Sequence, residues 1–317
     1  MSAQSGAVLV TGSTGNVGRA VARHLASAGE TVISGVRDEA AGEAAGEGEG
    51  AGAGEGAGAA EGEGAGVRDE GTGVAPGTEA RVLDFENPAG WPAALDGVDR
   101  MFLLRPPQIS DVRRFLFPPI DRALDAGVRQ IVFLSLQGVQ FNAVTPHRAV
   151  EKYLRERSAP FTFLRPNFFM QNLSTTYRDD IRDRGEIFVP AARARTAFVD
   201  TDDLGAVAAA VLTRPGHLGK AYTLSGEQSL DYYGVARQLT AALGYEVRYA
   251  SPSVEEYVAR LTEQGAAADY IEVQKMIYRV VRMNVSAFPN RTIRRLTGRP
   301  ATTFAEFAHR ERATLAR

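Results

Sequence analysis

The segment TGSTGNVGR, residues 11–19, directly follows the apolar run AVLV at residues 7–10. Its three glycines are spaced three residues apart, and an amphipathic stretch comes after them. Gly12 permits a sharp turn, Gly15 lets the backbone approach a pyrophosphate, and Gly18 allows the following helix to pack closely against the strand. Free N–H groups at the start of that helix favour a bound anion. The segment therefore predicts a dinucleotide site, with further contacts from Thr14, Asn16 and Val17.

Short β-branched runs alternate with amphipathic stretches along much of the chain, which is typical of parallel α/β folds. Strands are expected at residues 7–11, 31–36, 81–84, 100–104, 130–134 and 161–164. Helices are expected at residues 17–28, 110–126, 146–157, 202–212, 232–243, 254–263 and 304–314. We therefore predict an α/β fold with a Rossmann-type doubly wound parallel sheet and a smaller C-terminal substrate lobe.

The rhythm of strands and helices loosens after Pro166, which suggests a change of domain. Residues 1–165 are expected to form the NAD(P)-binding Rossmann core. Residues 166–317 are expected to form the smaller substrate lobe, with some segments returning to the Rossmann sheet. Within the core, Pro118 and Pro119 should break or kink the helix that contains them, because proline lacks an N–H donor and clashes with the preceding turn.

A low-complexity segment interrupts the core after the second strand. Residues 39–66 consist only of Ala, Gly and Glu, and the motif GVRDE stands at residues 35–39 and again at residues 66–70. Such a composition offers almost no apolar side chains to bury, so residues 39–70 are expected to form a disordered insert. The seven glutamates of residues 39–66 hide a positive remainder, because the net charge of −2 becomes +5 over the other 289 residues.

The composition excludes several classes of protein. Cysteine is absent and the four histidines are scattered, which excludes disulfides and thiolate catalysis and leaves no support for a metal site. No apolar run reaches the roughly 18 residues that a membrane helix needs, and no export signal precedes the first strand. The modest positive charge falls short of a nucleic-acid-binding face. We expect a soluble, cytoplasmic monomer or homodimer that binds a small-molecule substrate, with no nucleic acid and no membrane.

The residues that follow the other strands indicate which cofactor binds. The second strand ends at Arg37, and an arginine there pairs with the 2′-phosphate of NADP, whereas an acidic residue would bind the free ribose of NAD. Because Asp38 follows, NADP(H) is preferred while NAD(H) stays open. After the third strand, Asp84 and Phe85 are expected to flank the adenine. After the fourth strand, the cofactor is expected to be bordered by Leu104, Arg105 and Pro106.

These motifs together resemble the NmrA-like family of atypical short-chain dehydrogenases/reductases. The resemblance is carried by the turn at residues 11–19 and by residues 36–37, 82–85, 102–107, 162–172, 198–200 with Asp203, and 303–307. It implies a Rossmann domain with a small C-terminal lobe, a preference for NADP(H), and a substrate cleft between the two. The family includes NADPH-dependent reductases of quinones and dyes, and this chain is expected to share that chemistry.

The helix at residues 146–157 departs from the wider superfamily, because the catalytic Tyr-x-x-x-Lys is missing. Tyr153 is followed four residues later by Arg157, and we interpret Tyr153 as a packing residue. The resemblance places His147 where related reductases carry a catalytic lysine. His147 is accordingly a candidate proton donor. The alternative is a structural residue in the first helical turn after Thr145 and Pro146, a sequence common at helix starts.

A substrate pocket is expected where strands end. Ser135 follows the fifth strand and is a second catalytic candidate, as a hydrogen-bonding partner of the substrate or the nicotinamide ribose. Gln137, Phe168, Phe169 and Met170 are expected to line the pocket, since ligands of α/β proteins bind at the carboxyl ends of strands. The aromatic residues among them could equally form the core of the second lobe.

Three functions agree with the sequence. The first is an NADPH-dependent reductase that transfers hydride to a quinone, an aromatic carbonyl or a dye-like molecule. The second is a non-catalytic regulator that senses NADP(H), which the missing tyrosine would allow. The third is an epimerase or dehydratase of the extended short-chain dehydrogenase type, and it ranks last because such enzymes normally keep Tyr-x-x-x-Lys.

Overall fold

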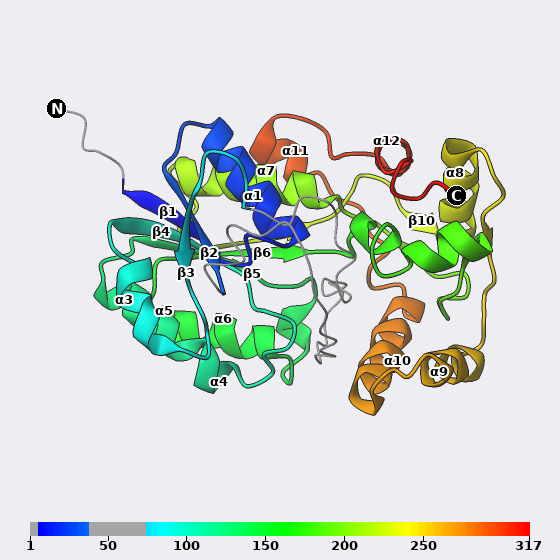
Figure 1. Ribbon diagram of the computed structural model, residues 1–317, viewed down its shortest axis with the longest axis horizontal. Coiled ribbons are helices and arrows are strands. Elements are labelled where there is room, and N and C mark those ends of the chain that lie inside the picture. The colour runs from blue at the N-terminus through cyan, green and yellow to red at the C-terminus, as the bar shows by residue number, and fades with distance from the viewer. Residues whose placement is uncertain (1–5, 38–73) are drawn as a thin grey trace. The chain divides into compact units, whose positions relative to one another are not determined.

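The computed structural model describes residues 6–37 and 74–317, and the predicted insert at residues 39–70 lies outside the described residues. A seven-stranded sheet has the order β3-β2-β1-β4-β5-β6-β9 (Figure 1). Its strands are β1 (Ala7–Val10), β2 (Val32–Val36), β3 (Glu79–Val82), β4 (Val98–Leu103), β5 (Gln130–Leu134), β6 (Phe161–Pro166) and β9 (Lys220–Leu224). The ladders from β3 to β6 are parallel, which confirms the predicted Rossmann-type sheet. Strand β9, at the edge next to β6, was not expected from the sequence.

Helices cover both faces of this sheet (Figure 1). One face carries α1 (Asn16–Ser27) and α7 (Thr201–Thr213). The other face carries α3 (Trp91–Ala94), α4 (Val112–Phe115), α5 (Phe117–Asp125) and α6 (Pro146–Glu156). The helix expected at residues 110–126 is two helices that meet at Leu116, so the predicted break is confirmed. The prolines lie in the first turn of α5, where a missing N–H donor costs nothing.

Of the described residues, 6–37, 74–165 and 201–222 form one compact unit. Its core lies between the sheet and helices α3 to α6 and contains Trp91, Met101, Phe133 and Phe163. On the other face, α1 packs against α7. A β-carbon on Gly205 of α7 would lie 2.6 Å from the carbonyl carbon of Ala20, so the contact of the two helices depends on that glycine.

Residues 166–200 and 223–317 form a second compact unit. It contains two short sheets, β8 (Arg195–Thr196) with β10 (Leu230–Asp231) and β7 (Glu186–Ile187) with β11 (Arg248–Tyr249). Its α-helices are α8 (Tyr232–Leu243), α9 (Val254–Glu263), α10 (Ala268–Arg282), α11 (Thr292–Thr297) and α12 (Phe304–Arg310).

The helix predictions in this second unit have mixed outcomes. Helices α8 and α9 have the predicted bounds, and α12 ends at Arg310, four residues earlier than predicted. Helices α10 and α11 were missed. The buried face of α10 includes Gln274 and Tyr278, which weakens the apolar periodicity by which helices are recognised. Among the described residues, no helix is both long enough and apolar enough to cross a bilayer.

Candidate functional site

The glycine turn after β1 has the geometry that a bound pyrophosphate requires. Gly12 adopts φ +65°, a left-handed conformation that favours glycine. Gly15 donates its N–H to the carbonyl oxygen of Gly12 at 3.0 Å and is the N-cap of α1, and no side chain caps the helix there. The N–H groups of the first helical turn are therefore available to an anion.

Gly18 allows α1 to begin directly against this turn. A β-carbon on Gly18 would lie 2.0 Å from the carbonyl oxygen of Gly12, far inside any allowed contact. The close approach expected from the sequence is thus made to the turn at the end of the strand. Any other residue at this position would push the helix away from the turn.

Two buried hydroxyls, which sequence reasoning missed, fix the turn to neighbouring strands. Thr11 Oγ1 accepts the N–H of Leu104 at 2.7 Å, just after β4. Ser13 Oγ donates to the carbonyl oxygen of Gly35 in β2 at 2.9 Å. The turn lies where the strand order reverses between β1 and β4, which is the position at which open α/β sheets bind their ligands.

The remaining turn residues differ in exposure. Thr14 and Asn16 are exposed and Val17 is buried, while Arg19 Nη2 donates to the carbonyl oxygen of Thr14 at 3.0 Å. Arg37 is exposed directly after β2, one strand away from the turn. An uncapped helix start beside an exposed guanidinium fits a dinucleotide with an additional phosphate. The contacts of Thr14, Asn16, Val17 and Arg37 with the cofactor stay predictions.

The segment after β3 is held in the core of the first unit. Phe85 is buried with its ring edge-on to Trp91, at 5.4 Å between centroids. The indole Nε1 of Trp91 donates to the carbonyl oxygen of Asp84 at 2.9 Å. The Asp84 carboxylate accepts the N–H of Glu86 and is half-buried. The ring of Phe85 is committed to packing, and the contacts of both residues with adenine stay predictions.

The segment after β4 is shaped by a buried arginine. Arg105 is 3% exposed, and its Nη1 donates to the carbonyl oxygens of Pro106, Pro107 and Ile109 at 3.0, 3.0 and 2.5 Å. The guanidinium thus stabilises the conformation of the loop that contains it. Leu104 is buried beside the glycine turn, and its contact with the cofactor stays a prediction, as do those of Arg105 and Pro106.

Ser135 lies directly after β5 and is 1% exposed. Its Oγ donates to Glu151 Oε1 of α6 at 2.8 Å. Glu151 is fully buried and also accepts two hydrogen bonds from Arg165, from Nε to Oε1 at 2.8 Å and from Nη2 to Oε2 at 2.6 Å. Arg155 Nη1 lies 3.3 Å from Oε2. Sequence reasoning missed Glu151, although a charged residue on the apolar face of an amphipathic helix was a usable signal.

His147 lies in the first turn of α6 and is 4% exposed. Its ring stacks on Phe133 of β5 at 5.8 Å between centroids. Thr145 is the N-cap of α6 and accepts the N–H of Arg148, and Pro146 is the first helical residue. This helix start is the one on which the structural interpretation of His147 was based. His147 therefore lies close to the carboxyl end of the sheet, and its catalytic role stays a prediction.

Tyr153, further along α6, is a packing residue, as interpreted from the sequence. Its ring stacks on Phe117 at 3.7 Å and its hydroxyl donates to Asp121 at 2.6 Å, both in α5. Burial and the adjacent Asp121 carboxylate raise the pKa of Tyr153 to about 12. The hydroxyl is thus engaged on α5.

The predicted pocket residues belong to both units. Gln137 is half-buried in the first unit, three residues after β5 ends. Phe168, Phe169 and Met170 are buried in the second unit, and Phe168 and Met170 pack in its apolar core. Met170 also lines a small cavity there together with Phe198, Gly226, Glu227, Leu230 and Phe304. The place of these four residues in a substrate pocket stays a prediction.

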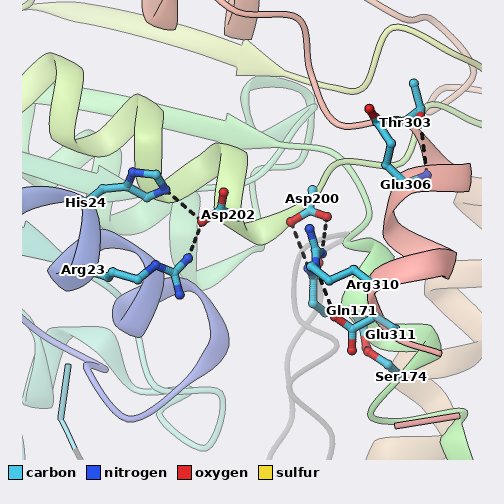
Figure 2. Close-up of polar contacts among 10 residues, drawn as sticks. All are labelled: Arg23, His24, Gln171, Ser174, Asp200, Asp202, Thr303, Glu306, Arg310 and Glu311. Carbon is cyan, nitrogen blue, oxygen red and sulfur yellow. Dashed lines mark hydrogen bonds and ion pairs between the residues drawn. The ribbon is translucent and has the colours of Figure 1, made fainter. Parts of the chain in front are cut away.

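Two further polar clusters were not expected from the sequence (Figure 2). In the first unit, Asp202 of α7 accepts hydrogen bonds from His24, at 2.8 Å, and from Arg23, both in α1. The hydrogen bond from His24 is the main cause that holds the pKa of Asp202 well below its usual value. In the second unit, the buried Asp200 carboxylate accepts from Gln171 at 3.0 Å and from Arg310 at 2.6 Å.

Comparison with known proteins gives consistent relatives. The model of the NmrA-like family matches residues 4–308. The chain is 33% identical over 243 residues to the NAD(P)H azoreductase of Xenophilus azovorans, covering 74% of this chain and 82% of that protein. It is 30% identical over 312 residues to a (4-alkanoyl-5-oxo-2,5-dihydrofuran-3-yl)methyl phosphate reductase of Streptomyces griseus, covering 95% and 96%.

Among solved structures, the chain is similar to the Citrobacter sp. triphenylmethane reductase complexed with NADP(H). The TM-score is 0.75 at 23% identity, and the match covers 96% of this chain and all of the other. This similarity shows a shared fold.

Proposed function

The chain belongs to the NmrA-like family and is an NAD(P)H-dependent oxidoreductase, and we propose that it reduces a quinone, an aromatic carbonyl or an azo dye with NADPH. The observation that carries the proposal is the uncapped start of α1, set behind the Gly12 turn at the point where the strand order reverses. The named activities of the azoreductase and the furan phosphate reductase support the choice of a reductase.

NADP(H) is the cofactor, and the first unit contains the groups that would hold it. The helix N–H groups behind Gly15 suit the pyrophosphate, and the exposed guanidinium of Arg37 suits the 2′-phosphate. When bound, NADPH supplies a hydride to the acceptor. Leu104 lies beside the turn, and together with the loop that Arg105 holds it is proposed to border the cofactor.

The acceptor is proposed to bind against the end of β5, with Gln137 from the first unit. Residues 166–200 and 223–317 are proposed as the substrate lobe, with Phe168, Phe169 and Met170 as apolar walls. His147 is the proposed proton donor, since the hydroxyl of Tyr153 is engaged with Asp121. A quinone spreads the charge it receives and needs little proton assistance, which agrees with the missing Tyr-x-x-x-Lys in the sequence of α6.

The test is NADPH oxidation by the purified protein with a panel of quinones, aromatic aldehydes and azo dyes. We expect turnover with at least one class and a slower rate when NADH replaces NADPH. Tight NADPH binding with no turnover over the whole panel would contradict the proposal and favour a regulator that senses NADP(H).

A further inference from the structure

Glu151 joins α6 to two strands of the sheet through a fully buried carboxylate. Ser135, which follows β5, donates one hydrogen bond, and Arg165, in β6, donates two. These strands are neighbours in parallel register, with Leu134 opposite Leu164. The carboxylate is therefore bound to the carboxyl ends of two adjacent strands, at the edge of the sheet where the proposed acceptor binds.

A buried ion pair of this kind is poorly explained by stability alone. Removing a carboxylate and a guanidinium from water costs about as much as their attraction returns, so apolar residues of similar volume would serve equally well. What the pair does supply is geometry. The two parallel hydrogen bonds from Arg165 fix both the distance and the plane of the Glu151 carboxylate. Ser135, at the end of the neighbouring strand, donates a third hydrogen bond to the same carboxylate.

His147 stands one helical turn before Glu151 on the same buried face of α6. The two residues are four positions apart, which places them on one side of a helix, and their exposed fractions are 4% and 0%. The imidazole lies on Phe133 of β5. Rotation or sliding of α6 against the sheet would move His147 and break the bonds of Glu151 together.

We propose that Glu151 is the positioning residue for His147 and that Ser135 and Arg165 are its partners in that task. The proposal rests on the proposed function in one respect, the role of His147 as proton donor. It also gives Ser135 a different role from the one expected from the sequence. The Ser135 hydroxyl gives its single proton to Glu151, so it holds the carboxylate and does not act as a proton donor to the substrate.

The experiment compares Glu151→Gln, Arg165→Lys and Ser135→Ala with the matched control Tyr153→Phe. The control removes a hydrogen bond that also ties α6 to a neighbour, but this neighbour is α5. Histidine side-chain NMR signals are recorded on the full chain, with the four histidines assigned by single substitutions. Steady-state kcat, KM and the NADPH dissociation constant are measured alongside with an azo or carbonyl acceptor.

We expect Glu151→Gln and Arg165→Lys to shift the His147 signals and leave those of His24, His217 and His309 in place. The kcat should fall about 10- to 100-fold, the range for a misplaced catalytic group, with NADPH affinity unchanged within about twofold. Ser135→Ala should give a smaller change in the same direction. Because this variant keeps the Glu151–Arg165 ion pair, it can replace Glu151→Gln in the test if Glu151→Gln does not fold. In a His147→Ala background, Glu151→Gln should cause no further loss of kcat.

Unchanged His147 signals in Glu151→Gln would overturn the inference, as would equal shifts in Tyr153→Phe. A fall in kcat that adds fully to that of His147→Ala would also overturn it, because Glu151 would then act by another route. If the wild type oxidises no NADPH, the proposed function fails, and the NMR comparison still decides on the position of His147. If His147→Ala lowers kcat while Glu151→Gln changes neither signal nor rate, only this inference fails.

Discussion

Gly18 and Gly12 are in contact across the start of α1: a β-carbon on Gly18 would lie 2.0 Å from the Gly12 carbonyl oxygen. This contact sets the helix directly behind the turn, with Gly15 as its N-cap and no side-chain cap at its first N–H groups. Substitutions at Gly18 and Gly15 should therefore distinguish the effect of the turn on protein stability from its effect on cofactor binding.

Gly18→Ala should lower both the free energy of unfolding and the affinity for NADPH. The added methyl group must displace the turn or the helix, and overpacking of this kind costs about 1–3 kcal/mol. Thermal unfolding and calorimetric titration measure the two effects. Gly90→Ala is the matched control, since a β-carbon there would meet its nearest neighbour at 3.7 Å, an ordinary contact. Equal melting temperatures for Gly18→Ala and the wild type would contradict the contact.

Gly15→Val should abolish NADPH binding while the protein stays folded. The backbone at Gly15 has φ −88° and ψ 170°, which a branched residue can adopt, and we expect the added side chain to obstruct the approach of the pyrophosphate to the helix start. Titration calorimetry with NADPH, together with a circular dichroism spectrum, tests this. Retained binding would mean that the turn is purely structural.

Arg37→Ala should remove most of the preference for NADPH over NADH. A charge-assisted hydrogen bond to phosphate contributes about 1.5–3 kcal/mol, so the ratio of the two dissociation constants should fall roughly tenfold or more. Affinity for NADH should be unchanged. Arg122→Ala, which removes an exposed arginine in the last turn of α5, is the control. Equal affinities of the wild type for the two cofactors would contradict the role given to Arg37.

His147→Ala should lower kcat on carbonyl or azo acceptors by about 10²-fold, as expected for the loss of a general acid. Quinones should lose less, because they give a delocalised anion that water protonates afterwards. NADPH affinity should stay the same. Steady-state kinetics with one acceptor of each class measures the difference. A drop in melting temperature or in NADPH affinity, without a difference in kcat loss between the acceptor classes, would show that His147 is a structural residue.

Asp202 should make the first unit more stable above pH 4 than below it. Its pKa is lowered in the folded state, chiefly by the hydrogen bond from His24. The stabilisation is therefore fully present above the unfolded value of about 3.9 and is lost as the pH falls through the folded value. Its size should be about 0.5–1 kcal/mol, because the pair is partly exposed and screened by water.

Asp202→Asn should remove this component of the pH dependence. Denaturant unfolding between pH 3 and pH 6 measures it, with Asp96→Asn, an exposed aspartate near β4, as the control. Parallel stability curves for Asp202→Asn and the wild type over this range would show that the bond to His24 contributes nothing.

Local patterns sufficed to predict several elements in each of the two units. The strand at residues 130–134 and the helices at residues 232–243 and 254–263 have the predicted bounds, since each is a short run with clear periodicity and a capping or turn residue beside it. Strand β9 was missed because its exposed Lys220 and Ala221 carry no apolar alternation. It forms a strand because it pairs with β6 at the edge of the sheet, which is a tertiary contact.

The candidate site divides in the same way. The spacing of Gly12, Gly15 and Gly18 alone predicted the turn and the anion site proposed there, because only backbone sterics are involved and these act between residues close in sequence. Glu151, which accepts the Ser135 hydrogen bond, lies 16 positions further along the chain, and Arg165, which also donates to Glu151, lies 14 positions beyond that. No local pattern contains them. Only the tertiary structure, by packing α6 across β5 and β6, decided that Glu151 would be buried between a serine and an arginine.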